Sequence, residues 1–388
     1  MRILIVVRRM TQGGVQQQTA SFAQAALALG IETHVLILKS SRHEIPLPEG
    51  TVVHRISMRS LQFSSPRGIG NYLLSHLLLP LGVPGSRDFG TGEFLSRWFM
   101  KEFLPELTRT WGRSDHIFLR AQGTFDLLHN CHMPGIIHRY VDGAPQKFRA
   151  RLPLFRPLAR WMNRREYGRG DHICVSGGLA EALREITVSC QVPDARITVF
   201  RNFVSISRIR SLAQEAPPPG LPEKYIMTLG RLVRPKRQDL IIRALALLPE
   251  DVHLVICGGG PMEGELRQLA RDLGLEGRVI FTGSTDNPYP LLRQARLLAH
   301  ASEREGFGLI FLEALILDIP IAAMESQGGM RDVLRGPVLE KQIAPRNPEA
   351  FARLIARTME NPYHSTPDMY QQYDHVPAMT ELLEKLKA

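Results

Sequence analysis

The sequence contains little cysteine and no long hydrophobic run. Only four cysteines occur among its 388 residues, at positions that match no metal-binding spacing: Cys131, Cys174, Cys190 and Cys257. This usage predicts reduced core residues and argues against a disulfide-stapled secreted domain. The longest apolar stretch, residues 72–85, is interrupted by Ser75, His76 and Pro80 and falls short of the approximately 20 residues that span a bilayer. We therefore expect no membrane-spanning helix.

The amino-terminal apolar run is also too short for a secretion signal. It covers only residues 3–7 and ends at Arg8 and Arg9, whereas a signal peptide carries its positive charge before a longer apolar core. The sequence therefore predicts a cytoplasmic protein. With 44% hydrophobic residues, a chain of this length is expected to form two ordinary domains, each with its own core.

The positive charge of the chain is confined to its first half. Residues 1–220 contain 28 Lys and Arg against 16 Asp and Glu, whereas residues 221–388 contain 20 against 22. Such asymmetry indicates an anionic partner for the first half, which could be a nucleic acid, a lipid headgroup surface or a phosphorylated substrate. The alternative is a surface charge that only keeps the protein soluble.

Short β-rich runs alternate with helix-length segments along the chain. In the first half these runs are residues 2–7, 33–38, 116–119, 135–140, 172–176 and 197–201. After a proline-rich stretch the alternation restarts with runs at 225–230, 253–260, 278–283 and 296–302. Such alternation predicts parallel sheets covered by helices. We expect an α/β fold of two Rossmann-like domains that face each other across a cleft, where such folds bind ligands.

The same alternation suggests the domain boundaries. We assign residues 1–205 to an N-terminal domain, residues 206–222 to a linker and residues 223–369 to a C-terminal domain. The linker assignment depends on the Pro-rich sequence QEAPPPG at 214–220. A C-terminal helix at 370–388 is expected to join the N-terminal domain.

The strongest local motif is EGFGLIFLEAL, in which Glu305 precedes a Gly-Phe-Gly turn and Glu313 follows eight residues later. Gly306 and Gly308 let a ligand approach the backbone, and N–H groups at the start of the expected helix favour a diphosphate. Eight residues of helix rise about 12 Å, so one carboxylate could reach a sugar hydroxyl while the other reaches a ribose diol. The motif predicts a nucleotide-sugar site.

A second motif, TLGRLVRPKRQDL, follows a predicted strand. Gly230 permits a tight turn, and Arg231, Lys236 and Arg237 lie around the start of the next expected helix. Cations here can neutralise a departing diphosphate, and charge stabilisation at the leaving group is the main task in breaking a sugar–phosphate bond. The alternative is a solvated basic loop.

A third motif places Gly13 and Gly14 between the first expected strand and the first helix, where Rossmann-like folds bring backbone amides to a phosphate. Only two glycines are present instead of the three of the dinucleotide fingerprint. Lys39 stands where an acidic residue would end the second strand. The sequence therefore disfavours a nicotinamide cofactor.

These three motifs, in this order, resemble those of GT-B glycosyltransferases of family four, a retaining group that makes bacterial surface polysaccharides, lipid-linked mannosides and sucrose. Further matching segments are VSGGLAEAL at 175–183, Asn202 before Phe203 and Val204, GGGP at 258–261, FTG at 281–283 and GGMRDV at 328–333. The resemblance covers most of the chain and is densest over residues 225–335. It implies an acceptor-binding N-terminal domain and a C-terminal domain that binds a nucleotide-sugar donor.

The resemblance also implies roles for single residues. Glu305 would contact the donor sugar and Glu313 the ribose, while Arg231 and Lys236 would hold the diphosphate, with Arg237 as a substitute. The donor shell would be completed by Gly14, Gly230, Gly283, Gly306, Phe307, Gly308 and Leu309. Retention would follow a same-face route in which the leaving diphosphate accepts the acceptor proton, which makes Glu305, Arg231 and Lys236 the catalytic residues. Because no Asp-x-Asp pair follows a strand in the middle of the chain, we expect no metal and no other cofactor.

One feature of that family is missing, namely a histidine after the fifth strand of the N-terminal domain. The corresponding residues read GIIHRYVD, in which His138 lies two residues early and Tyr140 occupies the usual place. A histidine in such a run is more often structural. His138 and Tyr140 are nevertheless the candidates for contact with the sugar or the acceptor.

The basic residues of the first half concentrate at 146–171, a segment with seven arginines. Phe155, Leu158 and Trp161 recur between the cations, which is typical of an amphipathic segment on an anionic membrane or a phosphorylated glycolipid. The residues expected to make this contact are Arg149, Arg151, Arg156, Arg160, Arg164 and Arg165. The alternative is an ordinary arginine-rich surface helix.

Together these features predict a retaining hexosyltransferase at the cytoplasmic face of the cell membrane. Its donor would be a nucleotide diphosphate sugar, with uridine diphosphate as our first expectation and GDP-mannose left open, and its acceptor a glycan or glycolipid of the lipopolysaccharide or polysaccharide type. The alternatives are a nucleotide-sugar epimerase on a similar frame and a basic nucleic-acid-binding protein. Nucleic acid is disfavoured as a partner because aromatic residues are only 7% of the chain and no binding motif for it is present.

Overall fold

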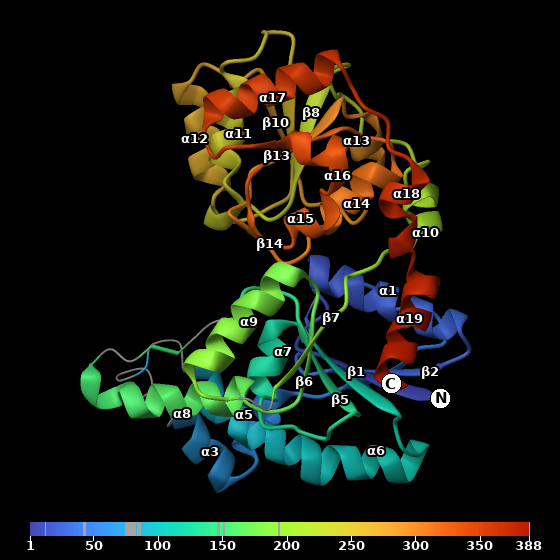
Figure 1. Cartoon of the computed structure of the whole chain (residues 1–388), viewed down its shortest axis with the longest axis vertical. Coiled ribbons are helices and arrows are strands. Elements are labelled where there is room, and N and C mark those ends of the chain that lie inside the picture. The colour runs from blue at the N-terminus through green and yellow to red at the C-terminus, as the bar shows by residue number, and fades with distance from the viewer. Residues whose placement is uncertain are drawn as a thin grey trace. The chain divides into compact units, whose positions relative to one another are not determined.

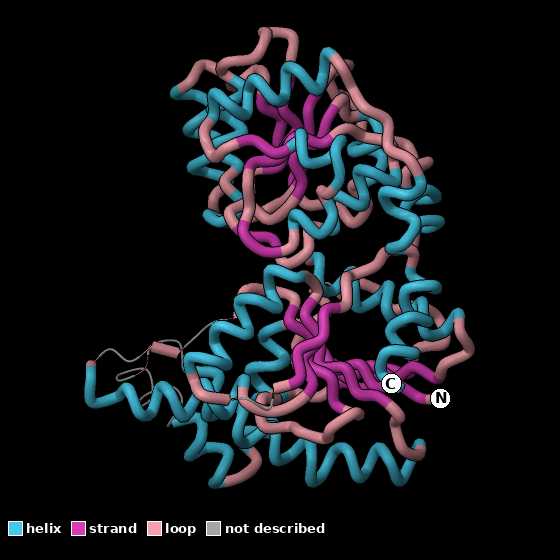
Figure 2. Tube along the Cα trace, in the orientation of Figure 1, coloured by secondary structure: helices cyan, strands magenta, loops and turns pink. Residues whose placement is uncertain are grey.

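The computed structural model describes residues 1–11, 13–41, 44–73, 83, 87–145, 148–149, 152–192 and 195–387. The chain divides into two compact units: Met1–Asn202 with Ala378–Ala388, and Phe203–Pro377. Each unit contains one large sheet with helices around it (Figures 1 and 2). Arg151 and most of the apolar stretch 72–85 lie outside the described residues.

The first unit is built on a seven-stranded sheet with the order β3-β2-β1-β4-β5-β6-β7. Its strands are β1 Arg2–Val7, β2 Glu32–Ile37, β3 Val52–Arg55, β4 His116–Arg120, β5 Ile137–Val141, β6 Asp171–Cys174 and β7 Arg196–Val199. All neighbouring pairs are parallel, and β1 lies between β2 and β4. The strand order therefore reverses between β1 and β4, which is the switch point of a doubly wound sheet.

Helices connect these strands. The longer ones are α1 Gly14–Ala28, α2 Met58–Phe63, α3 Pro66–Leu73, α5 Arg87–Trp98, α6 Leu104–Trp111, α7 Gln122–Leu127, α8 Arg156–Tyr167 and α9 Gly177–Ser189. Local sequence signals start some of them; the hydroxyl of Ser176, for example, accepts from the Leu179 N–H at 3.3 Å and caps α9. The final helix, α19 His375–Lys387, returns to the first unit from residue 378 onward (Figure 1).

The second unit repeats this arrangement with a six-stranded sheet of order β10-β9-β8-β11-β13-β15. Its strands are β8 Tyr225–Leu229, β9 His253–Cys257, β10 Val279–Gly283, β11 Leu297–His300, β13 Ile321–Met324 and β15 Ile343–Ala344, with β12 Arg304–Glu305 and β14 Gln327–Gly328 forming a separate pair. All the pairs are parallel. The order reverses between β8 and β11, so the second switch point lies there.

The helices of the second unit are α10 Ile206–Leu212, α11 Gln238–Leu245, α12 Glu263–Asp272, α13 Tyr289–Gln294, α14 Leu309–Ile316, α15 Met330–Val333, α16 Gly336–Leu339, α17 Pro348–Glu360 and α18 Pro367–Tyr370. Residues 206–212, which the sequence assigned to a linker, thus form helix α10. A continuous apolar core joins the sheet to α11, α12 and α17.

The predicted α/β class with two parallel sheets is confirmed, but the sequence analysis missed three strands of the two large sheets and the short pair β12 and β14. β3 is a half-exposed edge strand, β15 has two residues, and β13 reads IAAM, in which alanine gives little β signal. All four cysteines are buried and free of disulfides, as predicted. Among the described residues no helix is long and apolar enough to cross a membrane.

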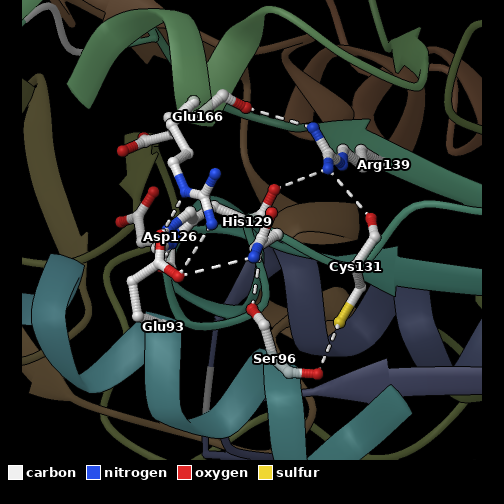
Figure 3. A network of polar contacts seen from close by, with 9 residues as sticks. Glu93, Ser96, Asp126, His129, Cys131, Arg139 and Glu166 are labelled. Atoms are coloured by element: carbon white, nitrogen blue, oxygen red, sulfur yellow. Dashed lines mark hydrogen bonds and ion pairs between the residues drawn. The ribbon is translucent and has the colours of Figure 1, made fainter. Parts of the chain in front are cut away.

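A buried polar network fastens α8 to the first unit (Figure 3). Arg139 on β5 is 1% exposed, and its guanidinium donates hydrogen bonds to the carbonyl oxygens of His129, Cys131, Glu166 and Arg169. On α5, Glu93 accepts from the ring of His129 at 3.3 Å and from Arg165 of α8 at 3.1 Å. These contacts satisfy buried polar groups and fix the position of the basic helix.

The sheet of the first unit also buries several histidines. His138 on β5 is 1% exposed, and its Nε2 lies 3.1 Å from Nδ1 of His116 on β4. Burial lowers the pKa of His138 to about 4 and that of His172 on β6 to about 3. Both rings are therefore neutral at pH 7, and protonating either one would place a charge in the core.

This burial predicts acid sensitivity of the first unit. An unfolded histidine titrates near pH 6.5, so between pH 6.5 and 4 the unfolded chain binds the proton first and stability falls as pH falls. For His138 alone the loss is about 3 kcal/mol. Urea unfolding followed by tryptophan fluorescence measures it, because Trp98, Trp111 and Trp161 all lie in the first unit. His138→Gln should flatten the pH dependence of the unfolding free energy. An unchanged slope would show that His138 is not the cause of the acid sensitivity.

Candidate active site

The two loops that carry the predicted donor residues meet at the switch point of the second sheet. They follow β8 and β11, which are neighbouring strands. The Glu303 N–H donates to the Pro235 carbonyl at 2.8 Å, and the Ser302 hydroxyl lies 3.3 Å from the same oxygen. Residues that are about 70 positions apart in the sequence are thus brought into direct contact, at the place where α/β sheets bind ligands.

A buried carboxylate lies at the centre of this contact. Glu305 Oε1 accepts from Lys236 Nζ at 2.5 Å and from His300 Nε2 at 2.9 Å. The Glu305 side chain is 11% exposed, and no hydrogen bond from a described residue reaches its Oε2. Burial would raise the pKa of Glu305, but the hydrogen bonds and charges of His300 and Lys236 hold it well below its usual range. Glu305 is therefore a fixed carboxylate with one oxygen available.

Helix α14 begins directly beyond Glu305 and is capped by Gly308. This glycine has φ 87°, and a Cβ there would lie 2.6 Å from the ring of Phe311. The helix has no side-chain N-cap and no acidic residue in its first turn, so its amide end favours an anion. Phe307 is 2% exposed and packs edge-on against Tyr373, so only its main chain can reach a ligand. Gly306 and Leu309 on either side are partly exposed.

Glu313 lies on α14 and differs from Glu305 in its environment. Its Oε1 accepts from the Tyr289 hydroxyl at 3.3 Å, and burial raises its pKa to about 7. The helix starts at Leu309, after the Gly-Phe-Gly turn as expected, but Glu305 lies before it on strand β12, so the estimate of a 12 Å helical rise between the two carboxylates is wrong. The spacing between the two carboxylates is therefore not a helical rise.

The strand-end loops around this pair are packed backbone to backbone. Gly230, with φ 145°, follows β8, and a Cβ on Gly258 would lie 2.0 Å from the Gly230 carbonyl oxygen. Gly283 ends β10 with φ 72°, and its carbonyl accepts from the Gly258 N–H at 2.8 Å. Arg231 projects from this layer as an exposed residue. A side chain at Gly258 would separate the loops, whereas Gly230 and Gly283 are favoured by their positive φ.

Arg237 does not have the freedom that the sequence suggested. Its guanidinium pairs with Asp239 at 2.9 Å and with Glu303 at 2.9 Å, and these hydrogen bonds raise its pKa above the usual value. Two carboxylates therefore already neutralise its charge. We correct the expectation that Arg237 can replace Lys236 at the diphosphate.

The first unit corrects two further expectations. Tyr140 is 1% exposed and lies under Arg120, whose guanidinium is 4.1 Å from the ring centroid, and His138 is equally buried. Both residues point into the layer between the sheet and α1, where Tyr140 packs against Phe22. Their side chains leave no surface for a sugar or an acceptor.

The residue that does stand at the end of β5 is Asp142. Its Oδ2 accepts from the Ala121 N–H at 3.0 Å, and its Oδ1 lies 3.6 Å from Arg120. The side chains of Asp142 and Arg120 are 3% and 0% exposed. Sequence reasoning missed this pair, although the carboxylate directly after a predicted strand was the available signal. Sequence reasoning also missed His300, and the sequence alone contains no signal that would have identified it.

The basic segment divides into anchored and exposed arginines. Arg164 is exposed but donates to the Cys190 carbonyl at 2.6 Å, and the half-buried Arg165 pairs with Glu93. Arg149, Arg156 and Arg160 are exposed. The expected apolar face is also divided, since Phe155 and Leu158 pack against a small core. The apolar side chains left exposed are Leu152 at 56%, Leu154 at 80% and Trp161 at 48%.

Residues 212–374 match the model of a protein family described as glycosyl transferases group 1. The matched residues lie within the second unit of this chain. The match contains the ion pair of Lys236 with Glu305, the capped helix α14 and Glu313. In the described part of this unit and of the first, no group of three or more His, Cys, Asp or Glu could hold a metal ion.

Curated relatives match over part of their length. The chain is 30% identical over 151 residues to the N-acetylgalactosamine-N,N'-diacetylbacillosaminyl-diphospho-undecaprenol 4-alpha-N-acetylgalactosaminyltransferase of Campylobacter jejuni, covering 39% of this chain and 41% of that protein. It is 30% identical over 186 residues to the lipopolysaccharide core biosynthesis glycosyltransferase LpsE of Rhizobium meliloti, covering 47% of this chain and 52% of that protein. The chain thus spans about half of these relatives or less.

Solved structures match over nearly the whole chain. Anabaena Alr3699/HepE in complex with UDP and glucose has a TM-score of 0.67 at 18% identity and covers 100% of this chain and 99% of its own. WaaG, a glycosyltransferase involved in lipopolysaccharide biosynthesis, has a TM-score of 0.61 at 14% identity. The match covers 98% of this chain and 95% of the WaaG chain. At these identities the likeness shows the fold, and it confirms the predicted GT-B fold of two Rossmann-like domains.

The cap of α14 gives a direct prediction. Gly308→Ala places a Cβ against Phe311 at a left-handed φ, so we expect a loss of about 1–3 kcal/mol in unfolding free energy. Gly264→Ala on α12 is the matched control, because a Cβ there meets nothing within 4 Å and should stabilise the helix by up to about 1 kcal/mol. Urea unfolding followed by circular dichroism compares them. Equal stability of the two variants would show that the cap is unstrained.

Proposed function

We propose that this chain is a retaining glycosyltransferase that moves a hexose from a nucleotide diphosphate sugar, with uridine diphosphate as the nucleotide. The acceptor is lipid-linked, a lipopolysaccharide or a polysaccharide. The reaction takes place at the cytoplasmic face of the cell membrane. The observation that carries this proposal is the contact of Glu305 with Lys236 and His300 within a group 1 glycosyl transferase unit. Independence from metal ions is part of the proposal.

In this proposal the ion pair serves both halves of the donor. The Lys236 ammonium has three N–H donors, and its bond to Glu305 uses one, which leaves the others for the diphosphate. Oε2 of Glu305 accepts a hydrogen bond from a sugar hydroxyl, and Glu313 serves the ribose. His300 is a positioning residue, because its bond to Oε1 fixes the plane of the carboxylate. A contribution of Gly14 to the donor shell stays a prediction from the sequence.

The reaction breaks the bond between the anomeric carbon and the diphosphate oxygen while the acceptor oxygen bonds to that carbon from the same face. The departing phosphate oxygen takes the acceptor proton. Negative charge grows on the diphosphate during this step, and Lys236, Arg231 and the amide end of α14 stabilise it. Each such interaction is worth about 3–4 kcal/mol in comparable sites.

The comparisons support the donor and acceptor classes. The Anabaena structures are described as complexes with UDP, with UDP and glucose, and with UDP-glucose. The relatives from Campylobacter jejuni and Rhizobium meliloti are named for transfer to an undecaprenol-linked acceptor and for lipopolysaccharide core synthesis. These names favour transfer over epimerisation, the alternative that the sequence left open.

The exposed part of the basic segment supports the membrane side of the proposal. Leu154 in the turn before α8 and Trp161 on α8 expose apolar surface next to Arg156 and Arg160. Apolar side chains beside exposed cations suit the interface of an anionic bilayer. The turn Pro153–Phe155 and the start of α8 are therefore the proposed contact.

The two diphosphate cations should matter for turnover. We expect Lys236→Ala and Arg231→Ala each to lower kcat about 100- to 1,000-fold, with a smaller effect on KM, because the charge develops in the transition state. Hydrolysis of the best UDP-hexose in excess EDTA measures this, with Lys341→Ala as a control from an exposed site of the same unit. The proposal fails if either variant keeps the wild-type rate, or if EDTA stops the wild type and magnesium restores it.

Membrane contact should depend on the exposed arginines. A cation near an anionic surface contributes about 1 kcal/mol, so Arg156→Gln with Arg160→Gln should weaken binding to phosphatidylglycerol vesicles about 30-fold. Arg243→Gln with Arg353→Gln removes the same charge from exposed sites of the second unit and should change nothing. Sedimentation with anionic and with neutral vesicles is the measurement. Equal binding to both vesicle types would contradict the contact.

A further inference from the structure

Arg346 connects the two loops that surround the buried carboxylate of the second unit. It lies between β15 and α17 and is partly buried. Its Nη1 donates to the carbonyl oxygens of Ser302 at 2.8 Å and Glu325 at 2.7 Å, and its Nη2 donates to that of Ala301 at 2.8 Å. Ala301 and Ser302 directly follow β11, and Glu325 directly follows β13. One guanidinium group therefore ties together the carboxyl ends of two neighbouring strands.

These three hydrogen bonds fix the strand ends firmly. A carbonyl beyond the end of a strand has lost its regular partner in the sheet, and a buried carbonyl without any partner is costly. Hydrogen bonds from a charged donor are stronger than neutral ones, and the planar fork of a guanidinium fixes the direction of each bond. Burial lowers the pKa of Arg346 from its ordinary value, while Glu303 and Asp239 oppose this shift, and the side chain stays charged at pH 7.

The first of these loops leads to Glu305. It begins directly after β11 and ends on β12, which pairs with β14 of the second loop. The Gly329 N–H of the second loop donates to the Glu305 carbonyl at 2.8 Å. The two loops are thus joined twice, by Arg346 at the strand ends and by the β12–β14 pair beside Glu305. A shift of the strand ends is therefore transmitted to the main chain that carries the carboxylate.

The loop after β8, which carries the two proposed diphosphate cations, has anchors of its own. The Leu232 N–H donates to the Gly259 carbonyl at 2.9 Å, and the Leu232 carbonyl accepts from the Met262 N–H at 3.0 Å. Both partners follow β9, which lies on the side of β8 away from β11. Loss of Arg346 should therefore disturb the loop of Glu305 more than the loop of the diphosphate cations.

The second unit contains another arginine with this kind of bonding, at the opposite edge of the sheet. Arg278 lies directly before β10 and is also partly buried. Its guanidinium donates at 2.7–3.3 Å to carbonyl oxygens near the amino end of β9, namely those of Leu245, Leu248, Pro249 and Val252. These bonds lie at the edge of the sheet away from the donor loops. Arg278 is therefore a matched control for Arg346.

We propose that Arg346 is a positioning residue for the donor sugar, which acts by holding the ends of β11 and β13 so that the Glu305 carboxylate stands at the sugar. This inference rests on the proposed function, because that function assigns the sugar contact to Glu305. Arg346 and Arg278 make the same kind of contact, so a comparison of the two separates positioning from stability.

Calorimetric titration of the full chain with UDP, and with the UDP-hexose that wild-type protein binds best, tests the proposal. We expect the hexose to add about tenfold or more to affinity in the wild type and less than about threefold in Arg346→Gln, while UDP alone changes less than about threefold. Arg278→Gln should lose a similar amount of unfolding free energy in urea and keep the full preference for the UDP-hexose. Arg346→Lys keeps the charge but replaces only one of the two nitrogens, so its preference should fall about threefold.

Two results would overturn the inference. One is a folded Arg346→Gln that keeps the wild-type preference for the UDP-hexose. The other is an Arg278→Gln that loses this preference as strongly as Arg346→Gln, since the effect would then follow from lost stability alone. If Arg346→Gln does not fold, Arg346→Lys decides, and an unchanged preference in it also overturns the inference. Wild-type protein that binds neither UDP nor any UDP-hexose is a different result, because it refutes the proposed function and the inference with it.

Discussion

The ion pair between Lys236 and Glu305 is the interaction on which the second unit's site depends. Removing both charges from water is costly, and such pairs seldom add net stability. This one is maintained because the fold leaves neither partner free: β12 and the Pro235 contact fix the two loops, and a side chain at Gly328 would lie 2.1 Å from the Glu305 carbonyl. The pair therefore holds an acceptor and a donor of hydrogen bonds at a constant spacing.

The two units share one construction. Each sheet reverses its strand order next to its first strand, and each places an uncapped helix amino end close to that point, α1 after Gly13 and α14 after Gly308. In the second unit a carboxylate lies beside the cation, which suits a ligand with both hydroxyl and phosphate groups.

The sequence predicted much of the second unit because its signals are local. A strand, a glycine turn and a charged residue follow one another within a few positions, so Glu305, Lys236 and Gly308 could be placed before the structure was known. Arg237 shows the limit of such local signals. Its partner Glu303 is 66 positions away, so no local pattern reveals that the charge of Arg237 is neutralised.

The first unit was harder for the same reason. On β5 the sequence does not show which side chains lie under α1, so it points to the buried His138 and Tyr140 instead of Asp142 directly after the strand. The segment around α8 was recognised as basic and apolar, but the direction of its residues depends on Glu93 and on the Arg139 network, which come from other elements. Long-range packing sets the orientation of these side chains, and local sequence patterns do not reveal long-range packing.

In the proposed function, Glu305, held by Lys236 and His300, recognises the sugar of the donor. The most direct measurement is a binding cycle that compares UDP with the UDP-hexose that binds wild-type protein best, in wild-type protein and in Glu305→Gln. We expect the hexose to add at least tenfold to affinity in the wild type and almost nothing in the variant, while UDP itself binds no more weakly. A variant that keeps the full preference for the UDP-hexose would show that Glu305 does not recognise the sugar.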